Sequence, residues 1–233
     1  MDETDRRIIK NSGGPEEIDI QAKREPAMPI ILSMVVDWPN IVTLLGLCSG
    51  VLAMFFALEQ NYPAAIIAML WSVLLDWYDG LVARAIPGRS ESHKLVGGHM
   101  DSLVDLFSSA VVPATLLLSV GDFSPWFYPG ALAIIMAGVL RLSYFGVFGV
   151  DSNGTYAGVT IDNSPIVLSA IFFLESFLDH GAFVGILYVA VLAMAVLHVA
   201  PIRTPKTGQV WYYVFTAYVL MATGGYSYLL WAR

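Results

Sequence analysis

Residues 62–84 read YPAAIIAMLWSVLLDWYDGLVAR, an apolar segment long enough to span a membrane that carries two aspartates near its end. The next apolar segment, residues 99–120, carries two more near its start. The four are Asp76, Asp79, Asp101 and Asp105. Because a carboxylate in hydrocarbon is costly unless a cation compensates it, four at a similar depth predict bound metal ions. Oxygen ligands favour Mg²⁺, Mn²⁺ or Ca²⁺, so the pattern is typical of a metal-dependent membrane enzyme.

The composition of the whole chain points to a membrane. Of the 233 residues, 57% are hydrophobic and 13% are charged, and the mean hydropathy is +0.66. A soluble domain of this length carries much less apolar surface. We therefore expect an all-α fold, a polytopic bundle of transmembrane helices in contact with the lipid bilayer, and no nucleic-acid partner.

Apolar runs of spanning length occur at seven places, and the shortest is the fifth, so we expect six to seven transmembrane helices. The runs are 40–59, 62–82, 99–120, 127–149, 164–178, 182–200 and 210–231. If the N-terminus faces the cytoplasm, every lysine and arginine except Arg233 falls at or near a cytoplasmic end. The positive-inside rule therefore predicts a cytoplasmic N-terminus.

The chain divides into three parts by composition. Residues 1–27 are polar, rich in acidic residues and without the apolar core of a signal peptide, so we expect a disordered cytoplasmic tail. Residues 28–38 are too short to span. They form either an interfacial helix with Trp38 at headgroup depth or an extension of the first span. Residues 39–233 are expected to form the transmembrane catalytic domain.

Helical spacing predicts that the four aspartates meet. Asp76 and Asp79 are three residues apart and Asp101 and Asp105 are four apart, so each pair lies on one face of its helix. Gly97 lies one turn before Asp101 on the same face. Two adjacent antiparallel spans can then turn all four carboxylates toward one another.

Arg84 and Arg141 are the only basic residues close to the spans, too few to balance four carboxylates. Two divalent cations, Mg²⁺ or Mn²⁺, would supply the missing charge and polarise a pyrophosphate. Gly80 and Ala83 keep one helix face shallow, which allows a phosphate or nucleotide to approach the backbone. Arg84, one turn beyond Gly80, offers a fork of donors to phosphate oxygens.

These residues resemble the signature of the CDP-alcohol phosphotransferases, DxxDGxxAR followed by a spacer and GxxxDxxxD. The chain matches every fixed position, with a spacer of twelve residues. The matching residues are Asp76, Asp79, Gly80, Ala83, Arg84, Gly97, Asp101 and Asp105. Fixed residues of several types at fixed offsets leave little room for a chance match.

The resemblance implies a reaction at the cytoplasmic side of the bilayer, and a homodimer. A CDP-linked lipid binds through its pyrophosphate to two metals, an acceptor hydroxyl attacks the phosphorus that bears the retained group, and CMP leaves. The four aspartates are then metal ligands, and Asp105 also acts as general base. The segment PNIVT, residues 39–43, is similar to the family's PNxxT and implies that Asn40 and Thr43 contact the nucleotide. Asn40 suits a helix N-cap equally well.

The acceptor is expected near the later spans. Arg141 is embedded late in one of them, and an intramembrane arginine is a functional candidate, here for one carboxylate or phosphate. Asn163 and Ser164 follow a polar loop and are candidates for hydrogen bonds to the acceptor. A single arginine favours L-serine over the more highly charged inositol phosphate or glycerol phosphate.

Within the family, the chain is most similar to the phosphatidylserine synthase branch. RLSYF at 141–145 resembles that branch's RxARF, and YAG at 156–158 resembles its YFxGLP. VTIDN at 159–163 replaces the expected LPxP, so serine and other acceptors such as choline both stay open. A divalent-cation transporter is the alternative from another class, but it predicts acidic residues midway through several spans.

Overall fold

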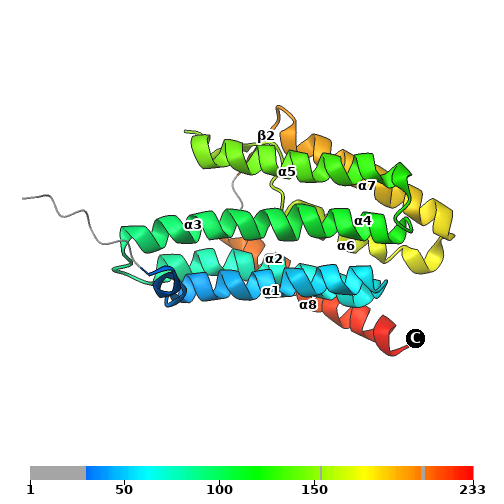
Figure 1. The fold of residues 1–233 in the computed structure, drawn as a ribbon, viewed down its shortest axis with the longest axis horizontal. Coiled ribbons are helices and arrows are strands. Elements are labelled where there is room, and N and C mark those ends of the chain that lie inside the picture. The colour runs from blue at the N-terminus through cyan, green and yellow to red at the C-terminus, as the bar shows by residue number, and fades with distance from the viewer. Residues whose placement is uncertain (1–29, 153, 206–207, 233) are drawn as a thin grey trace, which may run out of the picture. The chain divides into compact units, whose positions relative to one another are not determined.

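The computed structural model describes residues 30–152, 154–205 and 208–232, and we treat residues 31–233 as one unit. In the described residues the chain is almost entirely helical (Figure 1). The α-helices are α1 (Trp38–Leu58), α2 (Tyr62–Ala85), α3 (Glu91–Leu106), α4 (Val112–Val120), α5 (Tyr128–Phe148), α6 (Asn163–Phe172), α7 (His180–Val199) and α8 (Gln209–Trp231). Short 3₁₀ helices are η1 (Ile31–Val35), η3 (Pro125–Phe127) and η4 (Glu175–Phe177). The expected disordered tail, residues 1–27, lies outside the described residues.

Five helical segments among the described residues are long and apolar enough to cross a membrane, which confirms the all-α membrane bundle. They are Trp38–Leu58, Tyr62–Ala85, Glu91–Val120, Pro125–Phe148 and His180–Val199. Helices also occupy the other two expected positions, α6 and α8. The count of six to seven spans stays a prediction, since α6 has ten residues and α8 carries five tyrosines, two threonines and two glycines.

The third segment starts earlier than expected. Helix α3 begins at Glu91 rather than at residue 99, and a π-helical turn, η2 (Phe107–Val111), joins it to α4. The Ser90 hydroxyl accepts a hydrogen bond from the His93 backbone N–H and so caps the helix. The connection from α2 therefore shrinks to residues 86–90, and Gly97 lies well inside a helix.

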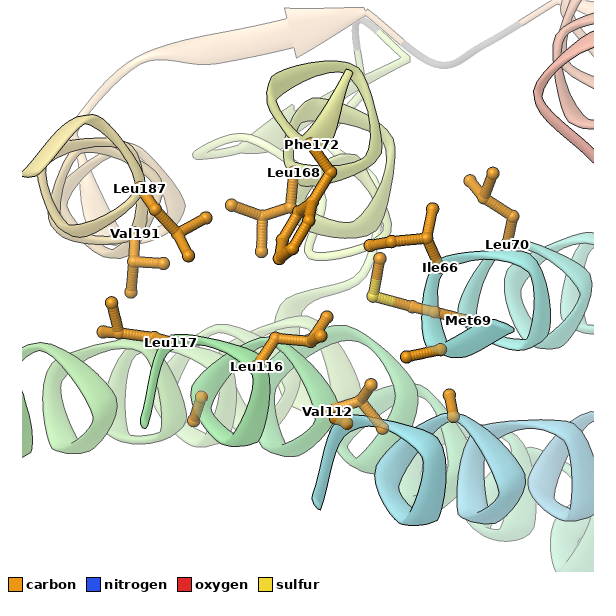
Figure 2. Close-up of a cluster of buried hydrophobic side chains, with 14 of the residues drawn as sticks. Ile66, Met69, Leu70, Val112, Leu116, Leu117, Leu168, Phe172, Leu187 and Val191 are labelled. Carbon is orange, nitrogen blue, oxygen red and sulfur yellow. The ribbon is translucent and has the colours of Figure 1, made fainter. Parts of the chain in front are cut away.

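The apolar core draws side chains from α1, α2, α4, α5, α6, α7 and α8, and Figure 2 labels members from α2, α4, α6 and α7. Its largest members are almost completely buried. Those labelled in Figure 2 are Ile66, Met69, Leu70, Val112, Leu116, Leu117, Leu168, Phe172, Leu187 and Val191. On α2 the core residues occupy the first half of the helix, and the aspartates follow in its second half. The packed half thus holds in place the polar half that carries the candidate site.

Small residues bring α1 close to α2 beside that polar half. The Ser72 hydroxyl lies 2.6 Å from the Gly46 carbonyl and 2.7 Å from the Ser108 hydroxyl. A Cβ on Gly50 would lie 3.2 Å from the hydroxyl oxygens of both serines, so glycine permits this approach. The contact fixes the register of α1 against α2 and η2.

Two short strands, β1 (Thr155–Ala157) and β2 (Arg203–Pro205), form an antiparallel pair that the apolar pattern did not predict. Tyr156 pairs with Thr204. Gly158 follows β1 with a φ of +71°, and a Cβ there would collide with the His198 carbonyl. The pair ties the segment before α6 to the end of α7.

Candidate active site

Three aspartates from α2 and α3 converge on one point. Asp76, Asp79 and Asp101 each offer a carboxylate oxygen, and these oxygens lie within 4.8 Å of one another. One oxygen of Asp76, Oδ1, is buried and has no hydrogen-bond partner among the described residues. Three carboxylates, one of which has a buried oxygen without a hydrogen-bond partner, fit a hard divalent cation, which prefers oxygen ligands.

The fourth aspartate, Asp105, stands one turn further along α3. It lies outside the three-carboxylate group and lines a small adjoining cavity together with Asp76 and Asp101. The structure therefore brings all four predicted aspartates to one region and places three of them in metal-binding proximity.

A cavity of about 200 Å³ opens on one side of the cluster, between α1, α2 and α3. Its lining includes most of the residues expected to contact the nucleotide or its phosphates. These are Asn40, Thr43, Gly80, Ala83 and Gly97. Two basic residues, Arg89 and Lys94, also line it. Donors, cations and shallow helix surface suit a phosphate-bearing ligand.

A larger cavity of about 710 Å³ opens on another side of the cluster, between α2, α6, α8 and the strand pair. Asp76, Asp79 and Asp101 contribute its polar end, while Ile166 and Phe215 belong to its apolar lining. A cavity with a largely apolar surface that meets the acidic cluster suits an amphiphile whose polar part reaches the cluster.

A third cavity, of about 140 Å³, connects the acidic cluster to Arg141. Arg141 is 8% exposed, and its guanidinium carbon lies 5.5 Å and 5.8 Å from the ring centroids of Phe145 and Tyr156. Burial raises the pKa of Tyr156, so its phenol is neutral near pH 7 and can donate a hydrogen bond. This cavity has room for a small polar molecule.

The comparison with known proteins agrees with this arrangement. A model of the CDP-alcohol phosphatidyltransferase family matches residues 36–224, which contain the cluster and all three cavities. The chain belongs to this family. As a CDP-alcohol phosphatidyltransferase it is a membrane transferase that moves a phosphatidyl-type group from a CDP-linked lipid to an alcohol, as the sequence predicted.

Named relatives come from archaea and bacteria. The chain is 33% identical over 174 residues to an archaetidylserine synthase of Methanothermobacter thermautotrophicus, covering 72% of this chain and 69% of that protein. It is 34% identical over 115 residues to a CDP-diacylglycerol–serine O-phosphatidyltransferase of Mycobacterium tuberculosis, covering 48% and 38%. The protein of that name from Bacillus subtilis is 31% identical over 111 residues, covering 47% and 60%. The chain thus spans less than two thirds of each bacterial relative.

Arg84 lies at the edge of the transferase's site rather than in a cavity wall. Its side chain is exposed, and its Nη2 donates a hydrogen bond of 3.2 Å to the Tyr212 hydroxyl. A Cβ on Gly80 would lie 3.6 Å from its Nη1. The guanidinium therefore stands beside Gly80, within reach of a ligand bound there.

The residues expected to bind the acceptor lie in different surroundings. Asn163 lines the large cavity, where its amide donates to the carbonyl and hydroxyl oxygens of Thr160. Ser164 is fully buried and lines none of the three cavities around the cluster. His198 Nδ1 lies 3.0 Å from the Val159 carbonyl and therefore donates, so Nε2 accepts from the Ser164 hydroxyl at 2.7 Å. Among these residues, Arg141 reaches the small cavity and Ser164 does not.

Two charged groups that line the site are not among the predicted site residues. Arg89 forms an ion pair with Asp37, whose side chains are 9% and 10% exposed respectively, and its Nη2 lies 3.4 Å from Asn40 Oδ1. Asp162 lines both the large and the small cavity. The only sequence signal for Asp162 was its place in the segment that departs from the family pattern.

Proposed function

We propose that this transferase moves a phosphatidyl-type group from a CDP-linked lipid to the hydroxyl of L-serine and releases CMP. The observation that carries the proposal is the three-carboxylate cluster at the meeting point of three cavities, one with basic lining, one largely apolar and one lined by a buried arginine. The three relatives described above are all named as serine-lipid synthases, which supports serine as acceptor.

Asp76, Asp79 and Asp101 would hold a divalent cation, and Asp105 would contribute to a second. The proposed ions are Mg²⁺ or Mn²⁺, because every donor is a carboxylate oxygen. When bound, such ions neutralise the diphosphate of the donor and polarise its phosphorus–oxygen bonds.

The basic cavity would take the nucleotide and diphosphate of the donor. Asn40 and Thr43 would contact the nucleotide from α1, and Gly97 would leave room for it on α3. Gly80 and Ala83 would let phosphate oxygens approach α2, with Arg84 and Arg89 as charged donors. The apolar lining of the large cavity would accommodate lipid.

In the proposed reaction, the serine hydroxyl oxygen forms a bond to the phosphorus that bears the lipid. The bond from this phosphorus to the bridging oxygen of the diphosphate breaks, and CMP leaves with that oxygen. Asp105 would accept the hydroxyl proton. Arg141 would hold the serine carboxylate through charge-assisted hydrogen bonds, while Asn163 would line the acceptor's approach. Because Ser164 lines none of these cavities, we assign it support of the α6–α7 contact through His198.

A cytoplasmic active site and a homodimer complete the proposal. The described lysines and arginines line the cavities around the cluster or lie next to residues that do, and positive residues favour the cytoplasmic side. They are Arg84, Arg89, Lys94, Arg141 and Arg203. The homodimer rests on the family resemblance.

The direct test incubates purified protein with labelled L-serine, Mg²⁺ or Mn²⁺, and a CDP-linked lipid with either ester or ether chains. We expect stoichiometric CMP and labelled lipid. Choline, inositol phosphate and glycerol phosphate in place of serine test the other acceptors. Metal uptake into liposomes without CMP release from any mixture would favour a transporter instead.

A further inference from the structure

Two opposite charges face the small cavity without pairing to each other. Asp162, the residue before α6, and Arg141 of α5 both line it, yet no ion pair within 4.0 Å joins them among the described residues. Arg141 Nε has no hydrogen-bond partner in the described chain, and neither has the buried Oδ1 of Asp162. Each group thus keeps one buried polar atom without a partner, which is costly, so both fit a ligand that brings the complementary groups.

The carboxylate of Asp162 is held in place from one side. The Trp77 indole N–H donates to its Oδ2 at 2.8 Å, which leaves Oδ1 as the free acceptor. Arg141 is held between the rings of Phe145 and Tyr156. Both groups are therefore preorganised, so little conformational entropy is lost when a ligand binds to them.

The size of the cavity favours a small ligand. At about 140 Å³ it is the smallest of the three cavities around the cluster, and it has room for a small polar molecule such as a three-carbon amino acid. The other aspartates of this cavity have different tasks in the proposed function. Asp76 and Asp101 belong to the metal cluster, and Asp105 serves the hydroxyl. Asp162 has no such task.

We propose that Asp162 is a specificity-determining residue that binds the α-ammonium group of the acceptor while Arg141 binds its carboxylate. The small cavity then selects a zwitterionic hydroxy-amino acid. This inference rests on the proposed function, because it assumes that the acceptor occupies this cavity.

The test compares three acceptors in wild type, Asp162→Asn and Arg141→Gln. L-serine carries both charges, 3-hydroxypropionate lacks the ammonium group, and ethanolamine lacks the carboxylate. Each is measured by CMP release from CDP-diacylglycerol, or as an inhibitor of serine turnover where it is not consumed. Asp162→Asn preserves shape and an oxygen for the Trp77 indole but removes the charge.

In Asp162→Asn the apparent affinity for serine and for ethanolamine should fall about 10- to 100-fold, as for a lost hydrogen bond between charged groups. The apparent affinity for 3-hydroxypropionate should change by less than about threefold. Arg141→Gln should lower the apparent affinity for serine and 3-hydroxypropionate and leave the affinity for ethanolamine unchanged. Trp77→Phe, which keeps the charge of Asp162, is the matched control and should retain the wild-type ranking of the three compounds.

Equal losses for all three compounds in Asp162→Asn would mean a structural role and overturn the inference. Unchanged discrimination would overturn it as well, while serine-dependent CMP release in wild type would leave the proposed function standing. Absence of CMP release from wild type with serine would refute the proposed function itself. If Asp162→Asn does not fold, the comparison of acceptors in wild type still tests the inference. Serine should bind at least about tenfold more tightly than 3-hydroxypropionate, and equal affinities would overturn the inference.

Discussion

Thr43 of α1 donates a side-chain hydrogen bond to the carboxylate of Asp79 on α2. Both side chains are buried, 2% and 5% exposed, and the Thr43 hydroxyl also lies 3.0 Å from the Pro39 carbonyl. The bond links the nucleotide side of the site to the metal cluster. It also fixes which direction the Asp79 carboxylate faces.

Thr43→Val removes this donor with little change in volume. A hydrogen bond to a charged group contributes about 1.5–3 kcal/mol, so we expect turnover to fall about 10- to 100-fold. The metal concentration for half-maximal CMP release should rise, because Asp79 is no longer oriented. Thr43→Ser, the control, retains the hydroxyl and should keep most of the wild-type activity. A wild-type metal requirement in Thr43→Val would show that the bond does not orient Asp79.

Gly97→Ala tests the close approach of α3 to α1. A Cβ at Gly97 would lie 2.6 Å from Asn40 Oδ1 and 3.3 Å from Arg89 Nη2. Both side chains must shift, so we expect the KM for the CDP-linked lipid to rise about tenfold, equivalent to about 1.4 kcal/mol. Gly98→Ala is the matched control, since a Cβ there meets nothing within 4 Å. Equal KM values for the two variants would argue against a donor site at this contact.

The metal cluster was predictable because its residues break a strong pattern. Carboxylates in membrane-length apolar segments stand out, and helical spacing alone places Asp76 and Asp79 on one face. Arg89 and Asp37 carried no such signal, since charges beside a span look like ordinary solvated ends. Only the folded chain shows that they meet and are buried.

Elements without apolar periodicity were also missed. The first turn of α3 is polar and two glycines follow at 97 and 98, so hydropathy placed the segment's start at residue 99, although Ser90 and Glu91 are a typical helix start. Strands β1 and β2 have three residues each, too few to show alternation, and they pair across α6 and α7. Long-range pairing of this kind is fixed by tertiary structure.

Asp105→Asn tests the proposed general base while leaving the three-carboxylate group intact. The change removes charge but little volume, and Asp105 lies outside the three-carboxylate group. We expect turnover to fall about 10²- to 10⁴-fold, the usual contribution of a general base. Thermal stabilisation by Mg²⁺ or Mn²⁺ should persist in this variant and be lost in Asp101→Asn. Wild-type-like turnover by Asp105→Asn would refute its role as base.

The buried ion pair between Asp37 and Arg89 should stabilise the donor side of the site. Asp37→Asn leaves the Arg89 guanidinium without its charged partner, and breaking a buried pair costs about 3 kcal/mol or more. We expect lower thermal stability in detergent for Asp37→Asn. Arg89→Gln should in addition weaken inhibition by CMP, because Arg89 lines the basic cavity.

The double variant Asp37→Leu/Arg89→Met decides between structure and binding. It replaces both charges with apolar groups of similar length, which often restores stability where a buried pair was broken. Recovered stability with CMP inhibition still weakened would assign Arg89 to the phosphate-binding surface, as proposed. Full recovery of both stability and CMP inhibition would show that the pair is only a structural link between the start of α1 and the loop before α3. Stability and CMP inhibition are therefore both measured on wild type, Asp37→Asn, Arg89→Gln and the double variant.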